Sequence, residues 1–263
     1  MIPLRPFLAK YSDHADRVVP ANVTENGSSL YGSVFWLTYA ANTLTIIAVS
    51  ILFRYADFVS SLGGTEFHLG LIVGVGTIGA LTMRGVQGVG IDRYGIRKMW
   101  LLSLIVLCIS LLAHLGVSRV NSVTIYCVRI LMTMGLSGVF GASITYISLR
   151  APAGRIGEAV GMLGSSGFVG MLLGPVISDY FIFNVAVITR VQVDRMFLCS
   201  SSVVVLAMAC ATLATWGYRH QVRSRRPSLL RTVRKYHPGA ILLVGVAVGA
   251  AMGVPHVFLR AYT

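Results

Sequence analysis

Seven long stretches of the chain consist almost entirely of apolar residues, and short polar segments separate them. A helix needs about 20 apolar residues to cross a hydrocarbon core of about 30 Å, and each stretch is of about that length. Leu and Ile mix with Gly and Ala without polar alternation, which favours helices over barrel strands. The sequence therefore predicts an all-α, polytopic transmembrane helix bundle with spans at residues 32–53, 67–83, 99–118, 120–149, 159–183, 196–218 and 239–259.

Composition indicates that lipid is the solvent of this chain. Of its 263 residues 55% are hydrophobic and 12% are charged, and the mean hydropathy is +0.75. These values lie outside the range of soluble domains, so we expect an integral multi-pass protein in contact with membrane lipid. The four cysteines lie inside apolar spans without C-x-x-C spacing and are read as small core residues, and no metal site is expected: Cys108, Cys127, Cys199 and Cys210.

The net charge of +13 is distributed unevenly over the connections between spans. Sixteen Lys and Arg residues fall in segments 1–31, 84–98, 150–158 and 219–238, whereas the alternate connections carry four. Cytoplasmic loops carry such an excess of cations, so the N-terminus is expected in the cytoplasm, with the protein in the plasma (inner) membrane. The cations then report orientation, and a nucleic-acid partner is not expected.

The most informative segment joins the second and third spans. Its letters are G-x-x-x-D-R-x-G-x-R-K, and we call its six defining residues the Asp92 motif: Gly88, Asp92, Arg93, Gly95, Arg97 and Lys98. We expect a short, Gly-rich and charge-dense turn that holds a carboxylate beside several cations at the cytoplasmic membrane face. Contacts from Asp92 to these cations and to a helix N-terminus would latch one conformation. The alternative is a turn whose cations only fix topology and whose Gly95 supplies a positive φ.

These residues resemble the Major Facilitator Superfamily, whose members carry a similar segment between their second and third helices. Here Gly90, Ile91 and Ile96 replace the family's Leu, small residue and Arg. The fourth span is similar to the family's arginine followed by glycines, and the fifth is similar to its antiporter signature, although Ser178 and Asp179 replace the closing glycines. The residues that carry these two likenesses are Arg129, Gly135, Gly138 and Gly141, and then Gly170, Gly174 and Pro175.

Several polar residues inside the spans are candidates for a substrate or proton pathway. Arg129 is the only charge in the fourth span, and burying it in hydrocarbon costs about 3 kcal/mol or more, so it is expected to face a cavity, unless it forms a structural pair or snorkels to the interface. Asn42 and Thr45 lie in the middle of the first span and either face a central site or bond neighbouring helices. Arg54 and Asp57 end that span, as part of a vestibule or as an i, i+3 ion pair.

Two glycine patterns have simpler readings. Gly170 and Gly174 belong to a series at three- or four-residue spacing in the fifth span, which predicts close helix packing, with a bend at Pro175. Gly74-x-Gly76-x-x-Gly79 has the letters of a dinucleotide fingerprint but lies inside an apolar span with no strand before it. No cofactor is therefore expected. Hydrolase and nucleotide-binding motifs are absent, and scattered histidines do not suggest a membrane enzyme.

The order of segments predicts four regions: a cytoplasmic polar tail (1–31), a six-helix bundle (32–218), a basic cytoplasmic linker (219–238), and a seventh helix that starts an incomplete second bundle (239–263). The resemblance implies a secondary transporter that moves a small solute by alternating access, with protons as the coupling ion and efflux as the favoured direction. Its partners would be the solute, H⁺, and a missing C-terminal bundle or a second copy. The alternative is a half-transporter that is inactive, or active only as a dimer.

Overall fold

The computed structural model describes residues 30–182, 188–218 and Ala247. In this part of the chain all regular elements are helical, which confirms the all-α class. Six helices among these residues are long and apolar enough to cross a membrane. The tail before residue 30, the basic linker and, apart from Ala247, the seventh span lie outside the described residues.

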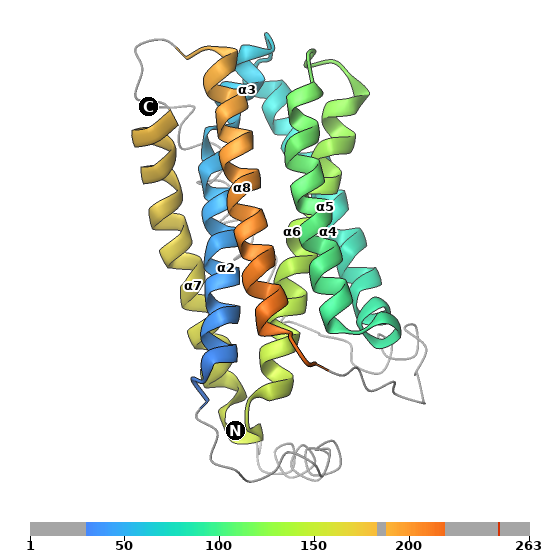
Figure 1. Cartoon of the computed structure of the whole chain (residues 1–263). Coiled ribbons are helices and arrows are strands. Elements are labelled where there is room, and N and C mark those ends of the chain that lie inside the picture. Colours follow the sequence, from blue (N-terminus) through green and yellow to red (C-terminus); the bar gives the residue numbers. More distant parts are fainter. Residues whose placement is uncertain (1–29, 183–187, 219–246, 248–263) are drawn as a thin grey trace, which may run out of the picture.

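The long helices run alternately up and down in one bundle (Figure 1). The first span is α2 (Ser33–Ile51), which continues through the 3-10 turn η1 (Leu52–Arg54) into α3 (Tyr55–Ser61). The other spans are α4 (Glu66–Tyr94), α5 (Ile96–Ala113) with η2 (His114–Gly116), α6 (Val123–Arg150), α7 (Ile156–Ile177) with the π-helix η4 (Ser178–Ile182), and α8 (Arg190–Ala214); η3 (Ala153–Arg155) precedes α7. At 1.5 Å per residue, even α5 with η2 is about 30 Å long.

Several helix starts are set by polar residues that satisfy free backbone N–H groups. Thr65 and His68 form a reciprocal capping box at the start of α4, and Thr189 and Gln192 do the same for α8. The Ser122 hydroxyl accepts a hydrogen bond from the Thr124 backbone N–H at 3.2 Å where α6 begins. These caps fix the points at which the chain enters its membrane-length helices.

Helix pairs pack in a definite pattern. Helix α2 packs against α7 and α8, α4 packs against α6, and α5 packs against α6 and α8. Large side chains fill the space between them, with Phe58, Trp100, Tyr146 and Phe197 fully buried. The cysteines are not core residues as expected, because Cys127 is exposed and the other three are half-buried.

Many apolar side chains instead point outward. Phe67, Leu81, Phe168 and Leu172 are each about 70% exposed, and Leu206 is 57% exposed. Outward apolar surface on this scale is a liability in water but the expected state in lipid. The bundle surface thus agrees with the composition.

Charges differ between the two ends of the bundle. The end with the α4–α5 and α6–α7 junctions, at the bottom of Figure 1, carries two carboxylates, Asp92 and Glu158, and six cations: Arg84, Arg93, Arg97, Lys98, Arg150 and Arg155. The opposite end carries four carboxylates, Asp57, Glu66, Asp179 and Asp194, and four cations, Arg54, Arg119, Arg190 and Arg195. Among the described residues, then, the cationic excess lies at the end that holds the Asp92 motif.

Candidate gating segment and interior polar sites

The Asp92 motif is not the loop-like turn expected from the sequence. Helix α4 continues to Tyr94 and α5 starts at Ile96, so Gly95 is the single residue between them. Gly88, Asp92 and Arg93 lie in the last turns of α4, and the two remaining cations follow in the first turn of α5. The expectation was wrong because low hydropathy after Met83 was taken as the end of the helix.

Burial explains why α4 continues through this polar stretch. Gln87 is buried, and its side-chain amide donates to the Gly138 carbonyl of α6 at 2.8 Å. Gly90 is buried against Met99 of α5, and a Cβ at position 90 would lie 2.7 Å from the Met99 Cε. The last turns of α4 are therefore fixed by packing on two helices, although their outer face is polar.

Gly95 has a backbone that only glycine adopts readily. Its φ is 87° and its ψ is 155°, so the positive φ suggested by the sequence is confirmed. The Gly95 N–H donates to the Ile91 carbonyl at 2.9 Å, and the Gly95 carbonyl accepts from the Met99 N–H at 3.2 Å. One residue thus ends α4, starts α5 and reverses the chain.

The charged members of the motif lie at the bundle surface. Asp92, Arg93 and Lys98 are exposed, and Arg97 is half-buried. The Arg93 guanidinium lies 5.3 Å from the centre of the Tyr94 ring. Gly88 faces open space, with nothing within 4 Å of an added Cβ. This places one carboxylate among cations at a single end of the bundle.

A second charged cluster lies at the same end. Arg155 makes two hydrogen bonds to the Glu158 carboxylate, at 2.7 and 2.8 Å, and the Tyr31 hydroxyl donates to the same carboxylate at 2.7 Å. The bond to Glu158 raises the pKa of the Tyr31 phenol above its ordinary value. The cluster joins the entry of α2 to the first turn of α7.

Arg129 lies within the bundle, near the opposite end of α6. Its guanidinium carbon is 4.3 Å from the centre of the Tyr55 ring, a cation–π geometry. Nη1 points to the Met132 Sδ at 3.6 Å, and Nε is buried without a hydrogen-bond partner in the described part of the chain. The side chain as a whole is half-buried. It forms no structural ion pair there.

Tyr55 itself is held by a buried histidine. His114 is fully buried and stacks on Phe197, with ring centres 4.7 Å apart. Its Nδ1 is 2.7 Å from the Ser110 carbonyl oxygen, which can only accept, so Nδ1 carries the proton. In neutral His114 the Nε2 then accepts from the Tyr55 hydroxyl at 3.3 Å. No local sequence pattern indicates this arrangement, because its residues are far apart in the chain.

The alternatives left open for Asn42 and Thr45 are decided by their partners. Asn42 is buried; its Nδ2 donates to the Ser166 hydroxyl of α7 at 2.7 Å, and its Oδ1 accepts from the Ser143 hydroxyl of α6 at 3.3 Å. Thr45 is buried and bonds the Ala41 carbonyl of its own helix at 2.8 Å. Asn42 therefore connects three helices, and in this conformation neither residue faces an open site.

We expect Asn42→Leu to destabilise the bundle by about 1–2 kcal/mol, the upper range for interhelical hydrogen bonds in membranes. The loss stays moderate because the single Ser143 hydroxyl proton can turn to the Phe140 carbonyl at 3.0 Å, and the Ser166 hydroxyl keeps its donation to the Leu163 carbonyl. Thermal unfolding of the purified protein in detergent measures the change. Thr43→Val is the matched control, since Thr43 bonds only the Tyr39 carbonyl of its own helix; an equal loss in both variants would contradict the bridge.

Arg54 forms the expected i, i+3 ion pair and a second one. Its Nη1 is 3.1 Å from Asp57 Oδ2, and its Nε is 2.8 Å from Asp179 Oδ1. Asp179 lies in the π-helix that follows Pro175, where the Ser178 hydroxyl also donates to the Ile51 carbonyl at 3.2 Å. These contacts attach the end of α7 to the α2–α3 junction.

The glycines of α7 separate into two faces. Gly170 and Gly174 are buried on α2, where a Cβ would lie 2.6 Å from Ile46 Cβ and 2.3 Å from Ser50 Cβ, respectively. Gly161 and Gly164 face open space. The first pair, which forms the predicted helix-packing motif with Pro175, thus packs closely on α2.

A tighter glycine seam between α4 and α6 was not predicted. A Cβ at Gly79 would lie 2.0 Å from the Ile130 carbonyl oxygen, and one at Gly76 would lie 2.8 Å from Arg129 Cγ. The Thr133 hydroxyl donates to the Gly76 carbonyl across the same seam. Two of the three glycines that imitate a dinucleotide fingerprint, Gly76 and Gly79, are thus explained by helix packing, whereas Gly74 faces the open side of α4.

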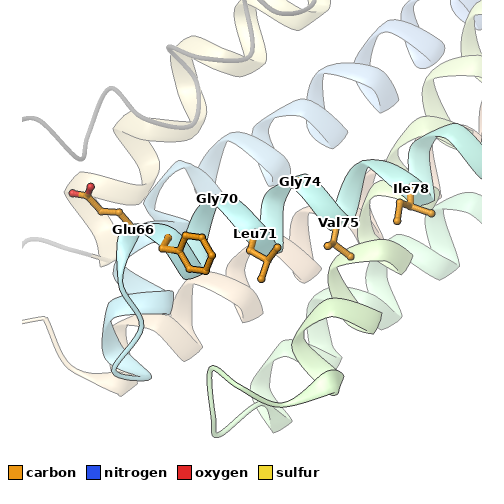
Figure 2. A pocket seen from close by; sticks show the side chains of 7 residues that line it. Glu66, Gly70, Leu71, Gly74, Val75 and Ile78 are labelled. Atoms are coloured by element: carbon orange, nitrogen blue, oxygen red, sulfur yellow. The ribbon is translucent and has the colours of Figure 1, made fainter.

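The outward face of α4 carries an open apolar groove of about 660 Å³. Figure 2 shows the side chains of Leu71, Val75 and Ile78 along one side of the helix, with Gly70 and Gly74 between them. The lining residues are Glu66, Phe67, Gly70, Leu71, Gly74, Val75 and Ile78. Among the described elements, no other helix covers this face.

Comparison with known proteins agrees with this architecture. The chain is similar to an uncharacterized MFS-type transporter, YfiU, of Bacillus subtilis (strain 168), with 29% identity over 123 residues that represent 46% of this chain and 21% of the relative. The matched part thus spans about a fifth of that relative's length. The sequence profile of the Major Facilitator Superfamily matches residues 32–262. Since this match takes in all six described membrane-length helices, the chain belongs to the Major Facilitator Superfamily.

Proposed function

We propose that this protein acts in secondary active transport of a small solute by alternating access, with protons as the coupling ion and export as the direction. The observation that carries the proposal is the Asp92 motif, which lies at one end of a six-helix bundle whose family consists of membrane transporters. A solute would bind near the middle of the membrane, between this bundle and a partner.

The uncovered helix faces offer room for a partner. The α4 groove and the exposed Phe168, Leu172 and Val176 of α7 form apolar surface that can face lipid, and a second bundle would bury it on docking. Gly161 and Gly164 add a face on which another backbone can approach closely. We propose a C-terminal bundle as this partner; the alternative is a second copy of this chain.

We assign the cationic end to the cytoplasm. The described residues at that end carry six cations and two carboxylates, whereas those at the opposite end carry four of each. Under this assignment the N-terminal side of α2 lies inside and the α3 end lies outside. The test is labelling of a cysteine introduced at Ser122 with a membrane-impermeant maleimide on intact cells, in a variant whose four native cysteines are replaced by Ala. Protection of that site would contradict the assignment.

Transport itself is tested in cells that express the full-length protein. We expect lower accumulation of at least one member of a set of fluorescent solutes with charges of −1, 0 and +1, and recovery of accumulation when a protonophore collapses the gradient. Crosslinking in the same membranes distinguishes the two candidate partners. A crosslinked dimer in active membranes indicates a second copy of the chain. A chain that changes no solute's accumulation would support the alternative of an inactive half-transporter.

Asp92→Asn is expected to lower the initial flux about tenfold while leaving membrane insertion intact. Removing one charge from a charge-assisted hydrogen bond costs about 1.5–3 kcal/mol, and 1.4 kcal/mol is a factor of ten in an equilibrium. Asp92 lies on the exposed surface of α4, so the substitution would reduce the stability of the latched conformation and not that of the bundle. The measurement is initial efflux of the solute identified above.

Glu66→Gln provides the matched control, because Glu66 is an exposed carboxylate at the other end of the same helix. It is expected to keep flux near the parent value. Unchanged flux in Asp92→Asn would count against the latch, as would an equal loss in the two variants.

A further inference from the structure

We infer that Arg129, held by the ring of Tyr55, binds an anionic group of the transported solute, so that the substrate class is organic anions. The inference rests on the proposed transport function and adds the charge of the substrate. Its basis is a cation inside the bundle that has no anion within ion-pairing distance in the described part of the chain.

The hydrogen-bonding capacity of Arg129 is largely unused. A guanidinium carries five N–H donors, yet the described chain offers only one contact, from Nη1 to the Met132 sulfur, a weak acceptor, at 3.6 Å. Nε is shielded by protein and has no acceptor among the described residues. Such donors are costly to leave unpaired at membrane depth. An acceptor group on a ligand would pair with them, and binding would therefore be favourable.

The Tyr55 ring holds Arg129 in place and leaves its donors for a ligand. The guanidinium carbon lies 4.3 Å from the centre of the Tyr55 ring, and the ring π-system offers no conventional acceptor to the planar fork of N–H groups. Gly76 has no side chain, so nothing at that position displaces the Cγ atom of Arg129. The Tyr55 hydroxyl is fixed by His114, so the stacking surface is itself held in place. A carboxylate or sulfonate can then accept two parallel hydrogen bonds.

The charges around this position favour an anion over a cation. The groups that face the Tyr55, His114 and Arg129 cluster from neighbouring helices include Arg190 of α8, whose Nη2 donates to the Leu115 carbonyl at 3.1 Å. The nearby carboxylates already have cationic partners: Asp57 and Asp179 pair with Arg54, and Asp194 pairs with Arg190 at 2.9 Å. The local field is therefore positive, and it would repel a cationic solute.

The test is binding of benzenesulfonate and of its neutral counterpart benzenesulfonamide to the purified full chain in nanodiscs of zwitterionic phosphatidylcholine. Isothermal titration calorimetry is expected to show tighter binding of the sulfonate. Arg129→Gln should weaken sulfonate binding at least about tenfold and leave sulfonamide binding unchanged, since a hydrogen bond to a charged group contributes about 1.5–3 kcal/mol. Arg129→Lys should weaken it less, because it keeps the charge but loses the fork.

Arg119→Gln is the matched control, because Arg119 is an exposed arginine in the connection just before α6. It should bind the sulfonate as the parent chain does. Thermal unfolding of each variant identifies a folding defect, and Arg129→Lys keeps the test decisive if Arg129→Gln does not fold. Equal affinity for sulfonate and sulfonamide, or a loss in Arg119→Gln as large as in Arg129→Gln, would overturn the inference.

A lipid headgroup phosphate presents the same anionic chemistry, so a separate experiment tests whether Arg129 binds lipid. In nanodiscs of anionic phosphatidylglycerol without solute, Arg129→Gln should retain the same lipids as the parent chain. Loss of bound anionic lipid in this variant, with no sulfonate binding in zwitterionic discs, would assign Arg129 to lipid and overturn the solute site. Both arms measure binding without flux, so their failure is distinguishable from failure of transport.

Discussion

Gly79→Leu is expected to destabilise the bundle by at least about 3 kcal/mol and to lower the yield of folded protein in membranes sharply. A Cβ at this position would lie 2.0 Å from the Ile130 carbonyl oxygen and 2.6 Å from the Thr133 hydroxyl. The nearest atom belongs to backbone, so no rotamer change relieves the overlap, and α4 and α6 must move apart. Thermal unfolding in detergent measures the loss, and Gly79→Ala should change stability in the same direction by less.

The consequences of that separation extend along the whole seam. The Thr133 hydroxyl donates to the Gly76 carbonyl, and Gln87 donates to the Gly138 carbonyl at 2.8 Å, so both bonds cross the interface that the leucine would open. Each bond left unmade at membrane depth adds to the packing cost. The effect therefore exceeds that of an ordinary overpacked site.

Gly85→Leu is the control, since it places the same side chain on the same helix where an added Cβ has nothing within 4 Å. It should be neutral or slightly stabilising, because Gly is about 1 kcal/mol less favourable than other residues in a helix. If Gly79→Leu unfolded at the same temperature as Gly85→Leu, the seam between α4 and α6 would not be a determinant of stability.

The all-α class and the six spans that the structure describes were predictable from the sequence, because a membrane imposes a minimum apolar length on every span. Helix ends were less predictable, since polar residues continue a helix when they find partners. Arg190 and Asp194 belong to α8 and form an i, i+4 ion pair at 2.9 Å, although they were assigned to a connection. Gln87 likewise extends α4 by bonding α6. Neither contact can be predicted from hydropathy alone.

The surroundings of the interior polar residues could not be predicted, because their partners are distant in the sequence. Arg129 was selected because a charge in an apolar span is unusual, but nothing local indicated that Tyr55 and His114 would lie beside it. Asn42 had two readings until the positions of Ser143 and Ser166 decided between them. The roles of Arg129 and Asp92 in transport remain predictions, because geometry places these residues without measuring a flux.

The proposed latch and the proposed anion site lie in different halves of the bundle. Asp92 is near the end of α4 at the cationic end, whereas Arg129 is the seventh residue of α6, near the opposite end. Helices α4 and α6 pack directly through the glycine seam, so a movement of one against the other would change both regions together. Under the two proposals, solute binding would bias the latch through this seam.

Gly95→Ala is expected to destabilise the protein by about 3 kcal/mol, near the upper end of the cost of one strained backbone conformation. With φ at 87° and ψ at 155°, a Cβ at Gly95 is strained whatever space surrounds it. The chain relieves the strain only by changing the angle between α4 and α5, which would displace Met99 from Gly90. Thermal unfolding measures the change in stability, and Asp92-dependent flux should fall with it.

Two further variants separate backbone strain from simple loss of a glycine. Gly88→Ala lies in helical backbone with open space around it, so it should be neutral or stabilising by up to about 1 kcal/mol. Gly95→Asn should not rescue the turn, because Asn tolerates a positive φ mainly with ψ near +47°, far from the 155° observed here. Recovery of parental stability in Gly95→Asn would mean that the junction relaxes to a left-handed helical conformation, and the account of Gly95 as an obligatory extended glycine would then be wrong.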